Sequence, residues 1–510
     1  MKTSLSAILK NRRAVTNAVL VAITLGILII GGFVVHYDWE LDQLCHSFGV
    51  VFWLLAMIST LAIYNLPKAK PENLFLIVGT LMGLCYMVAM VPLSVPDEGT
   101  HHMITLSQAA TLVKGGWNVD AAYLDYTAFT LHNNSYEAFE YMYGYKALFE
   151  ETLTGEIVVF EGYTSNYPLQ YFPQTIGASI ALLLGLNRYW LFLLGDLFNL
   201  AFYVGVTYVA IRRIPVGKTV MMLIATLPMA LHQASSLSSD PFLNCLSYLF
   251  IAEVVRAILG EGKMTWKEML CVVLPGLLMT PAKAVYGALM LAVAFIPGKR
   301  FSSKKVRWTF VIVTILVAVV AAFLPYIDWF LDRFGVTITG EATTQTHGYS
   351  LTWVFQHPAE TADIIGMTLL ENTFDTYLDT MVGYSLSGMS LYVNHGYVNM
   401  FVIIFALAAI VGAPGEKKLD GCRRAAFITI AAIGILAVVA SMFIGWTNPG
   451  ETRVGGVQGR YFLPIVPLLL IGLRSHHIEP KKDMSRFYAA AYAILNAFML
   501  QDVLDYIMLM

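Results

Sequence analysis

Apolar stretches of about twenty residues recur along this 510-residue chain, and they constrain its fold more than any other feature. Residues 14–35, 47–64 and 73–92 are each long enough to cross roughly 30 Å of hydrocarbon as a helix. Hydrophobic residues make up 57% of the chain and charged residues only 13%, which excludes an ordinary soluble protein of this length. The sequence therefore predicts an all-α polytopic membrane protein.

Charge is distributed unevenly along the chain, and this distribution orients the predicted spans. Of the 32 Lys and Arg residues, 25 lie in seven short segments. These segments are residues 1–13, 68–70, 212–218, 256–267, 299–307, 417–424 and 474–486. Because basic residues accumulate in cytoplasmic loops, all seven segments, including the N-terminus, are predicted to be cytoplasmic. In the long segments 93–188 and 328–395 most of the charged residues are acidic, so both are predicted to be outer loops.

This alternation gives about thirteen transmembrane helices if segment 167–186 is an interfacial or re-entrant helix on the outer surface. The predicted spans are residues 14–35, 47–64, 73–92, 189–211, 219–238, 241–259, 268–281, 284–297, 308–327, 396–413, 425–446, 460–474 and 487–507. Several are short and contain proline, which favours tilted or broken helices around a cavity. The predicted organisation is two N-terminal helices in 1–72, a membrane core in 73–475, and a cytoplasmic turn with a last helix in 476–510.

An ionisable segment, Pro96-Asp97-Glu98-Gly99-Thr100-His101-His102, directly follows the third predicted span. Charged groups at a membrane boundary are costly unless they are solvated or paired, so the segment indicates a functional site. A carboxylate in apolar surroundings can serve as general base for a sugar hydroxyl, which makes Asp97 and Glu98 the candidate catalytic residues. Asp97, Glu98 and His102 could also bind a divalent metal ion. The alternative is an ordinary solvated loop.

Three basic residues are predicted to lie on the same outer side, at unusual positions near the membrane. Lys283 falls between two short apolar stretches, and Arg453 and Arg460 flank a glycine-rich turn that contains Gln458. Cationic side chains beside exposed backbone amides can bind a phosphate, so these four residues form the candidate donor-phosphate site. Snorkelling, or an ion pair with Glu451, is the alternative for the arginines.

The candidate residues of the acceptor site or cavity are Asp240, Tyr167 and Tyr171, together with His102. Asp240 lies at the outer end of the fifth predicted span, and the two tyrosines open the predicted interfacial helix. Tyrosine suits both stacking on a sugar ring and anchoring at a membrane interface. Asp240 could instead cap the helix that starts with Pro241.

Four segments in this order also resemble a known family. They are Pro96-Asp97-Glu98 with His102, Tyr167-Pro168-Leu169-Gln170-Tyr171-Phe172-Pro173, Ser236-Leu237-Ser238-Ser239-Asp240, and Gly456-Val457-Gln458-Gly459-Arg460-Tyr461-Phe462-Leu463-Pro464. Over residues 73–475 the chain is similar to a bacterial family of polytopic membrane proteins of unknown function, which is grouped with the C-type (GT-C) glycosyltransferase superfold. The resemblance implies a GT-C-like core, a sugar donor carried on a polyprenyl phosphate, and a general base at Asp97 or Glu98.

The leading hypothesis is therefore an inverting glycosyltransferase of the cytoplasmic membrane with its active site on the outer face. It would transfer a sugar from a polyprenyl-phosphate donor to a cell-envelope glycan or a lipid-linked acceptor. A transporter or flippase of lipid-linked sugars, or a polysaccharide polymerase or ligase, is the alternative, because a charged cavity among broken helices suits each of them. Membrane lipids are expected around the protein, and no nucleic acid is expected as a partner. The residues leave the cofactor open, with a divalent metal ion as one possibility.

Overall fold

The computed structural model describes residues 43–114, 167–327, 348–474 and 482–509, together with positions 17, 19, 120, 121, 157, 158, 165 and 478. The first half contains α3 (Gln43–Asn65), α4 (Pro71–Ala89), α5 (Glu98–Lys114), β1 (Asp120–Ala121), β2 (Ile157–Val158), η3 (Pro168–Tyr171), α8 (Phe172–Leu183), α9 (Arg188–Arg213), α10 (Lys218–Ala225), α11 (Pro228–Ala234) and α12 (Asp240–Leu259). The second half contains α13 (Trp266–Met279), η4 (Ala284–Phe295), η5 (Gly298–Arg300), α14 (Lys304–Phe323), η6 (Leu324–Tyr326), α16 (Leu351–Gln356), α17 (Pro358–Asn372), η7 (Thr373–Leu378), α18 (Asp379–Val382), β3 (Ser385–Leu386), β4 (Leu391–Tyr392), α19 (His395–Ile410), α20 (Gly421–Gly445), η8 (Gly459–Phe462), α21 (Val466–Leu473) and α22 (Ser485–Leu509).

Seven of the described helices are long and apolar enough to cross a membrane. They are Cys45–Asn65, Pro71–Ala89, Tyr189–Arg213, Asp240–Leu259, Lys304–Phe323, Gly421–Gly445 and Ser485–Leu509. The prediction of a helical membrane protein is confirmed. Five other predicted spans contain shorter elements, namely α10 with α11, α13, η4, α19, and η8 with α21, so thirteen full spans are not established. The predicted span 14–35 lies almost entirely outside the described residues, as do most of segment 115–166 and all of 328–347.

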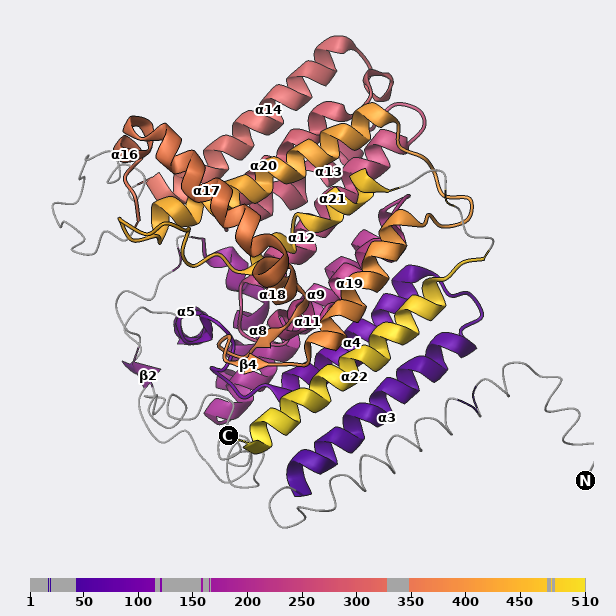
Figure 1. Ribbon diagram of the computed structural model, residues 1–510, viewed down its shortest axis with the longest axis vertical. Helices are drawn as coiled ribbons and strands as arrows, with labels where there is room; N and C mark the ends of the chain where they lie inside the picture. Colours follow the sequence, from indigo (N-terminus) through magenta and orange to yellow (C-terminus); the bar gives the residue numbers. More distant parts are fainter. Residues whose placement is uncertain are drawn as a thin grey trace, which may run out of the picture.

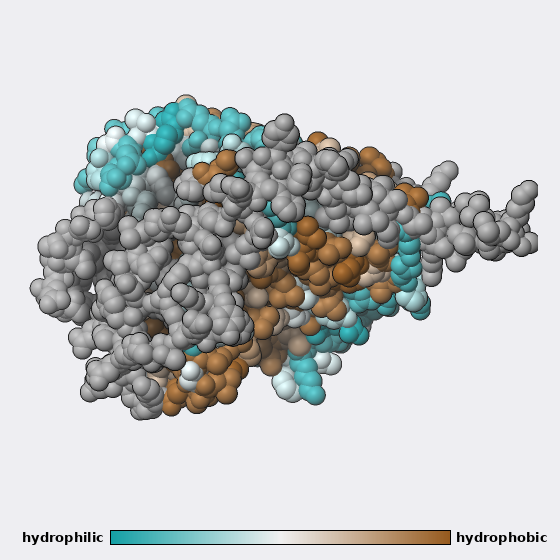
Figure 2. Space-filling view, turned by 90° about the horizontal axis from the view of Figure 1, so that it is seen from below, coloured by the Kyte–Doolittle hydropathy of each residue, from teal (hydrophilic) through white to brown (hydrophobic). Residues whose placement is uncertain are grey.

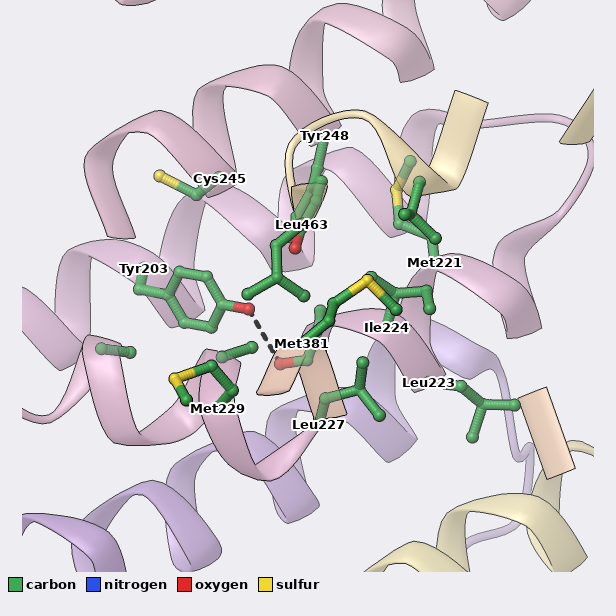
Figure 3. Close-up of a cluster of buried hydrophobic side chains, with 14 of the residues drawn as sticks. Tyr203, Met221, Leu223, Ile224, Leu227, Met229, Cys245, Tyr248, Met381 and Leu463 are labelled. Carbon is green, nitrogen blue, oxygen red and sulfur yellow. Dashed lines mark hydrogen bonds between the residues drawn. The ribbon is translucent and has the colours of Figure 1, made fainter. Parts of the chain in front are cut away.

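The predicted span 219–238 is broken in the middle, because α10 ends at Ala225 and α11 begins at Pro228. A helix end away from water needs partners for its free carbonyl groups. The hydroxyl of Tyr203 on α9 donates to the Ala225 carbonyl at 2.8 Å, which is the dashed line in Figure 3. The side-chain amide of Asn496 on α22 donates to the Thr226 carbonyl at 3.2 Å. Neighbouring helices therefore supply the hydrogen bonds that the break removes.

The helices are arranged roughly side by side in Figure 1, with α9 packed between α8 and α12, and α22 packed on α3 and α4. The element η4 lies against both α14 and α20. The segment predicted to be interfacial forms η3 and α8, and α8 packs on α5 and α9. Only two short antiparallel ladders, β1–β2 and β3–β4, occur among the described residues. The fold is thus a helical bundle in which the elements that carry the candidate residues meet at helix ends.

The described surface has a broad hydrophobic area, which Figure 2 shows bordered by hydrophilic residues. On α14, Ile312 and Leu316 are each 60% exposed and Val320 is 53% exposed. These residues are four positions apart, so they lie along one face of the helix. Exposed apolar side chains in such a row fit contact with lipid chains, in agreement with a membrane protein.

Gly177 of α8 sets the close approach of that helix to α9. A Cβ atom at this position would lie 2.1 Å from the carbonyl oxygen of Leu194, which is backbone and cannot rotate away. We expect Gly177→Ala to destabilise the protein by about 1–3 kcal/mol, the usual cost of overpacking. Gly205→Ala in α9 is the matched control, because nothing lies within 4 Å of a Cβ there. Thermal unfolding in detergent checks both, and equal melting temperatures for the two variants would contradict the prediction.

Candidate active site

The loop between α4 and α5 contains two non-glycine residues in the left-handed backbone region. Leu93 has a φ of 67° and Asp97 a φ of 63°. Such conformations cost about 1–3 kcal/mol each and persist only where the surrounding structure imposes them, most often at functional sites. The hydroxyl of Ser387 on the β3–β4 hairpin donates to the Ser94 carbonyl at 3.0 Å and helps to hold this loop. The Asp97 side chain emerges from it 61% exposed.

Glu98 is directed into the protein although it follows Asp97 directly. It is 2% exposed, and its two carboxylate oxygens accept the backbone N–H groups of Val95 at 3.1 Å and Leu237 at 3.2 Å. Burial raises the pKa of Glu98 to about 7, while hydrogen bonds from backbone N–H groups act in the opposite direction. Glu98 therefore joins the loop that carries Asp97 to the segment before α12, and it has no open side for a substrate.

Glu98 should also make stability depend on pH. Glu98 lies on α5, which is not among the seven candidate spans. The pKa of the Glu98 side chain is raised from 4.5 to about 7 in the folded protein. A group whose pKa is higher in the folded than in the unfolded protein contributes its full stabilisation at pH values below the unfolded-state pKa. This contribution is lost as the pH rises through the folded-state pKa. We expect the melting temperature to fall between about pH 5 and pH 7, and the Glu98→Gln variant to lack this part of the slope. Parallel curves of melting temperature against pH for the wild type and Glu98→Gln would contradict this prediction.

Arg460 is the centre of the site. Its η8 element can approach η7 and α18 closely because residue 459 is glycine, where a Cβ atom would lie 2.2 Å from the Tyr377 carbonyl oxygen and 2.3 Å from the Met381 backbone nitrogen. The Arg460 side chain is only 3% exposed, and its Nη2 donates to Oδ2 of Asp97 at 2.5 Å. Its Nη1 lies 3.4 Å from Oδ2 of Asp240. Among the described residues, its Nε has no hydrogen-bond partner, so the guanidinium retains a donor.

Asp240 connects Arg460 to a second cation. The Nζ of Lys283 donates to Oδ1 of Asp240 at 2.9 Å and lies 4.6 Å from the centre of the Tyr461 ring. The Arg460 guanidinium lies 5.2 Å from the centre of the same ring, so both cations are within cation–π distance of Tyr461. The predicted capping role of Asp240 is not seen, because Ser239 occupies the N-cap position. We call Asp97, Asp240, Lys283 and Arg460, with Tyr461, the charged cluster; its two carboxylates balance its two cations.

An apolar groove opens beside the charged cluster, with a volume of about 450 Å³. Its walls come from the start of η4, the end of α14 and the last third of α20, and its lining residues are Lys283, Ala284, Val285, Tyr286, Ala322, Phe323, Val438, Ser441, Met442 and Tyr461. The Tyr286 hydroxyl donates to the Tyr461 carbonyl at 2.9 Å and joins the groove to η8. Lys283 and Tyr461 belong to both the groove and the cluster. A ligand with an apolar chain and an anionic head would fit this arrangement.

The two histidines of α5 occupy different environments. His101 lies near the charged cluster, and its Nδ1 is 2.8 Å from the Tyr171 hydroxyl. Burial lowers the pKa of His101 to about 4, so its ring is neutral at neutral pH. His102 is fully buried and stacks on Phe192 of α9 with ring centres 4.2 Å apart. No group of three or more His, Cys, Asp or Glu side chains suited to a metal ion occurs among the described residues.

The other predicted site residues lie around the cluster rather than in it. Arg453 forms a bidentate ion pair with Glu371 of α17, with both N–O distances at 2.5 Å, and not with Glu451. Gln458 immediately precedes η8, and its side-chain oxygen has no hydrogen-bond partner in the described part of the chain. Tyr167 packs half-buried against the edge of the core. The structure thus brings together Asp97, Asp240, Lys283 and Arg460, and it places Tyr171 beside them.

Two residues of the site were missed by sequence reasoning. Tyr461 follows Arg460 directly, and its aromatic ring beside two cations could have been suspected from the Arg-Tyr pair. His101 belongs to the ionisable segment that follows the third predicted span. The pattern was visible, but no sequence signal separates His101 from the adjacent His102.

The comparisons with known proteins give one match. A family model described as "Predicted membrane protein (DUF2142)" matches residues 80–469, which include every member of the charged cluster. No curated protein and no solved structure matched the chain.

Proposed function

The chain belongs to the DUF2142 family of membrane proteins, and we propose that it is a glycosyltransferase that uses a lipid-phosphate sugar as donor. The observation that carries the proposal is the charged cluster at the end of the apolar groove. One cation, Lys283, lines the groove, and the other, Arg460, holds the exposed carboxylate of Asp97. A donor phosphate and a general base would therefore be neighbours.

The donor is proposed to lie with its lipid chain in the apolar groove and its phosphate at Lys283 and Arg460. Burial of apolar chain surface contributes roughly 25 cal/mol per Å², so the groove would supply much of the binding energy. The Nε of Arg460 is buried and has no hydrogen-bond partner among the described residues, so the phosphate is proposed to bind the Nη2 end, which pairs with Asp97. Arginine suits this role because its planar fork matches phosphate geometry.

The acceptor hydroxyl is proposed to approach from the exposed side of Asp97. The hydroxyl oxygen bonds to the anomeric carbon while the bond from that carbon to the phosphate oxygen breaks, and Asp97 takes the hydroxyl proton. The lipid phosphate leaves as an anion, which Arg460 and Lys283 stabilise, so no general acid is required. One displacement of this kind inverts the anomeric configuration.

The ion pair between Asp97 and Arg460 suggests an order of events. The Arg460 guanidinium donates to one oxygen of the Asp97 carboxylate at 2.5 Å. A donor phosphate competes for the same guanidinium and would release Asp97 toward the acceptor. Donor binding would in this way prepare the base, and acceptor alone would not.

The GT-C-like fold and the outer face of the cytoplasmic membrane belong to this proposal. They are supported by the resemblance of four sequence segments to a family that is grouped with that superfold, and by the basic segments at the ends of the helices opposite the cluster. The acceptor would be a cell-envelope glycan or its lipid-linked precursor.

The decisive experiment measures cleavage of the bond between sugar and lipid phosphate, rather than movement of the lipid-linked sugar across the membrane. The protein is reconstituted in vesicles with a panel of short-chain polyprenyl-phosphate sugars and a crude envelope-glycan acceptor, and the release of free polyprenyl phosphate is followed by mass spectrometry. Acceptor-dependent release supports the transferase. Intact lipid-linked sugar that exchanges between leaflets without release would support a flippase instead and overturn the proposal.

A further inference from the structure

A second cavity lies at the opposite end of the three elements that form the apolar groove. It has a volume of about 540 Å³, and it is lined by residues of the 294–298 segment and by Arg307, Asp420, Cys422 and Arg423. The groove is lined by the start of η4 and the ends of α14 and α20, whereas this cavity is lined by the end of η4 and the starts of α14 and α20. We call it the basic pocket.

Two arginines are held in the basic pocket by backbone carbonyl groups. Nη2 of Arg307 donates to the Ala294 carbonyl at 3.1 Å, and Nε of Arg423 donates to the Phe295 carbonyl at 3.1 Å. Arg423 also pairs with Asp420, which caps α20. The Nε of Arg307 is buried and has no hydrogen-bond partner among the described residues. The pocket therefore carries a net positive charge and an unused donor.

The surroundings of the basic pocket are those of a membrane boundary. Trp308, next to Arg307, is 54% exposed, and the exposed apolar row of α14 starts one turn later at Ile312. Tryptophan gathers at the level of lipid headgroups, and basic pockets between transmembrane helices bind anionic headgroups. A ligand here would place its charge between the arginines and its apolar chains along α14.

We propose that the basic pocket binds the phosphate of an anionic phospholipid. A free phosphate ion would satisfy the same two arginines, but it would leave the adjacent apolar face of α14 unused. The site is separate from the donor site, since Lys283 and the basic pocket lie at opposite ends of η4.

The test compares lipid binding to purified protein by native mass spectrometry, with phosphatidylglycerol and phosphatidylcholine as probes. The double variant Arg307→Gln/Arg423→Gln should bind phosphatidylglycerol at least about tenfold more weakly than the wild type, with phosphatidylcholine unaffected. The control Lys263→Gln/Lys267→Gln removes the same charge from exposed positions in the 256–267 basic segment, and it should bind as the wild type does. Equal losses in both double variants would show diffuse attraction and overturn the proposal.

A second measurement uses the wild-type protein and does not depend on variants that fold. Cys422 lines the basic pocket and is exposed, whereas Cys45, Cys85 and Cys245 are buried. Phosphatidylglycerol should slow the reaction of Cys422 with a water-soluble maleimide, and phosphatidylcholine should not. Unchanged labelling overturns the proposal. Equal protection by inorganic phosphate at the same concentration would overturn the assignment to a lipid.

Discussion

Asp97→Asn is expected to lower the rate of sugar transfer by about 10²–10⁴, the usual contribution of a general base, while the protein remains folded. The Asp97 side chain is 61% exposed, and the buried Arg460 guanidinium that pairs with it keeps Asp240 as a carboxylate partner. Asparagine tolerates the left-handed backbone as well as aspartate does, so the φ of 63° should be kept. The rate of polyprenyl phosphate release measures the effect, and the envelope glycan reports it in cells.

The matched control for this variant is Asp375→Asn. Asp375 is an exposed aspartate in η7 that makes none of the contacts of the charged cluster described above, and its loss should leave the rate unchanged. If Asp97→Asn retained wild-type transfer with a wild-type melting temperature, Asp97 would not be the base. His101 would then be the next residue to test, because its neutral ring lies near the cluster.

The long apolar helices could be predicted from the sequence because hydropathy reports burial in lipid directly. Seven predicted spans correspond to helices of sufficient length, including α14 and α20. The position of the break between α10 and α11 was not predicted, although Pro228 lies within the predicted span and begins α11. The hydrogen bonds from Tyr203 and Asn496 that satisfy the carbonyl groups at the break come from distant helices. Mean hydropathy stays high across Ala225, Thr226 and Leu227, so a hydropathy average does not mark the break.

The candidate site shows a similar division. Charge alternation predicted that Asp97, Asp240, Lys283 and Arg460 share one side of the membrane, and the structure places them in contact although 363 positions separate Asp97 from Arg460. Composition could not show that Glu98 points inward while Asp97 points outward. Asp97 has a left-handed backbone conformation, and the backbone N–H groups of Val95 and Leu237 hold the Glu98 carboxylate inside.

Partner choice was equally hidden in the sequence. Arg453 and Arg460 flank the same turn, yet one pairs with Glu371 on an exposed helix and the other with buried Asp240. Exposed pairs contribute little to stability, so the Arg453 pair is expected to add little to it. Only the packed structure distinguishes the two arginines.

Arg460→Gln is expected to lower both activity and stability. Loss of a buried donor to the leaving phosphate should reduce the rate by about 10²–10³. The variant also leaves buried Asp240 with Lys283 as its only close cation among the described residues, and breaking a buried pair typically costs about 3–5 kcal/mol, of which Lys283 offsets a part. Arg460→Lys keeps the charge but loses the planar fork, so we expect an intermediate loss of activity.

The double variant Asp240→Asn/Arg460→Gln separates the two effects. This variant removes the buried Asp240 carboxylate together with its arginine partner. Its melting temperature should therefore lie between those of Arg460→Gln and the wild type. Its activity should stay low, because the leaving phosphate has still lost the guanidinium. Recovery of transfer together with stability would mean that Arg460 only holds the fold, and the proposed phosphate site would then have to rest on Lys283 alone.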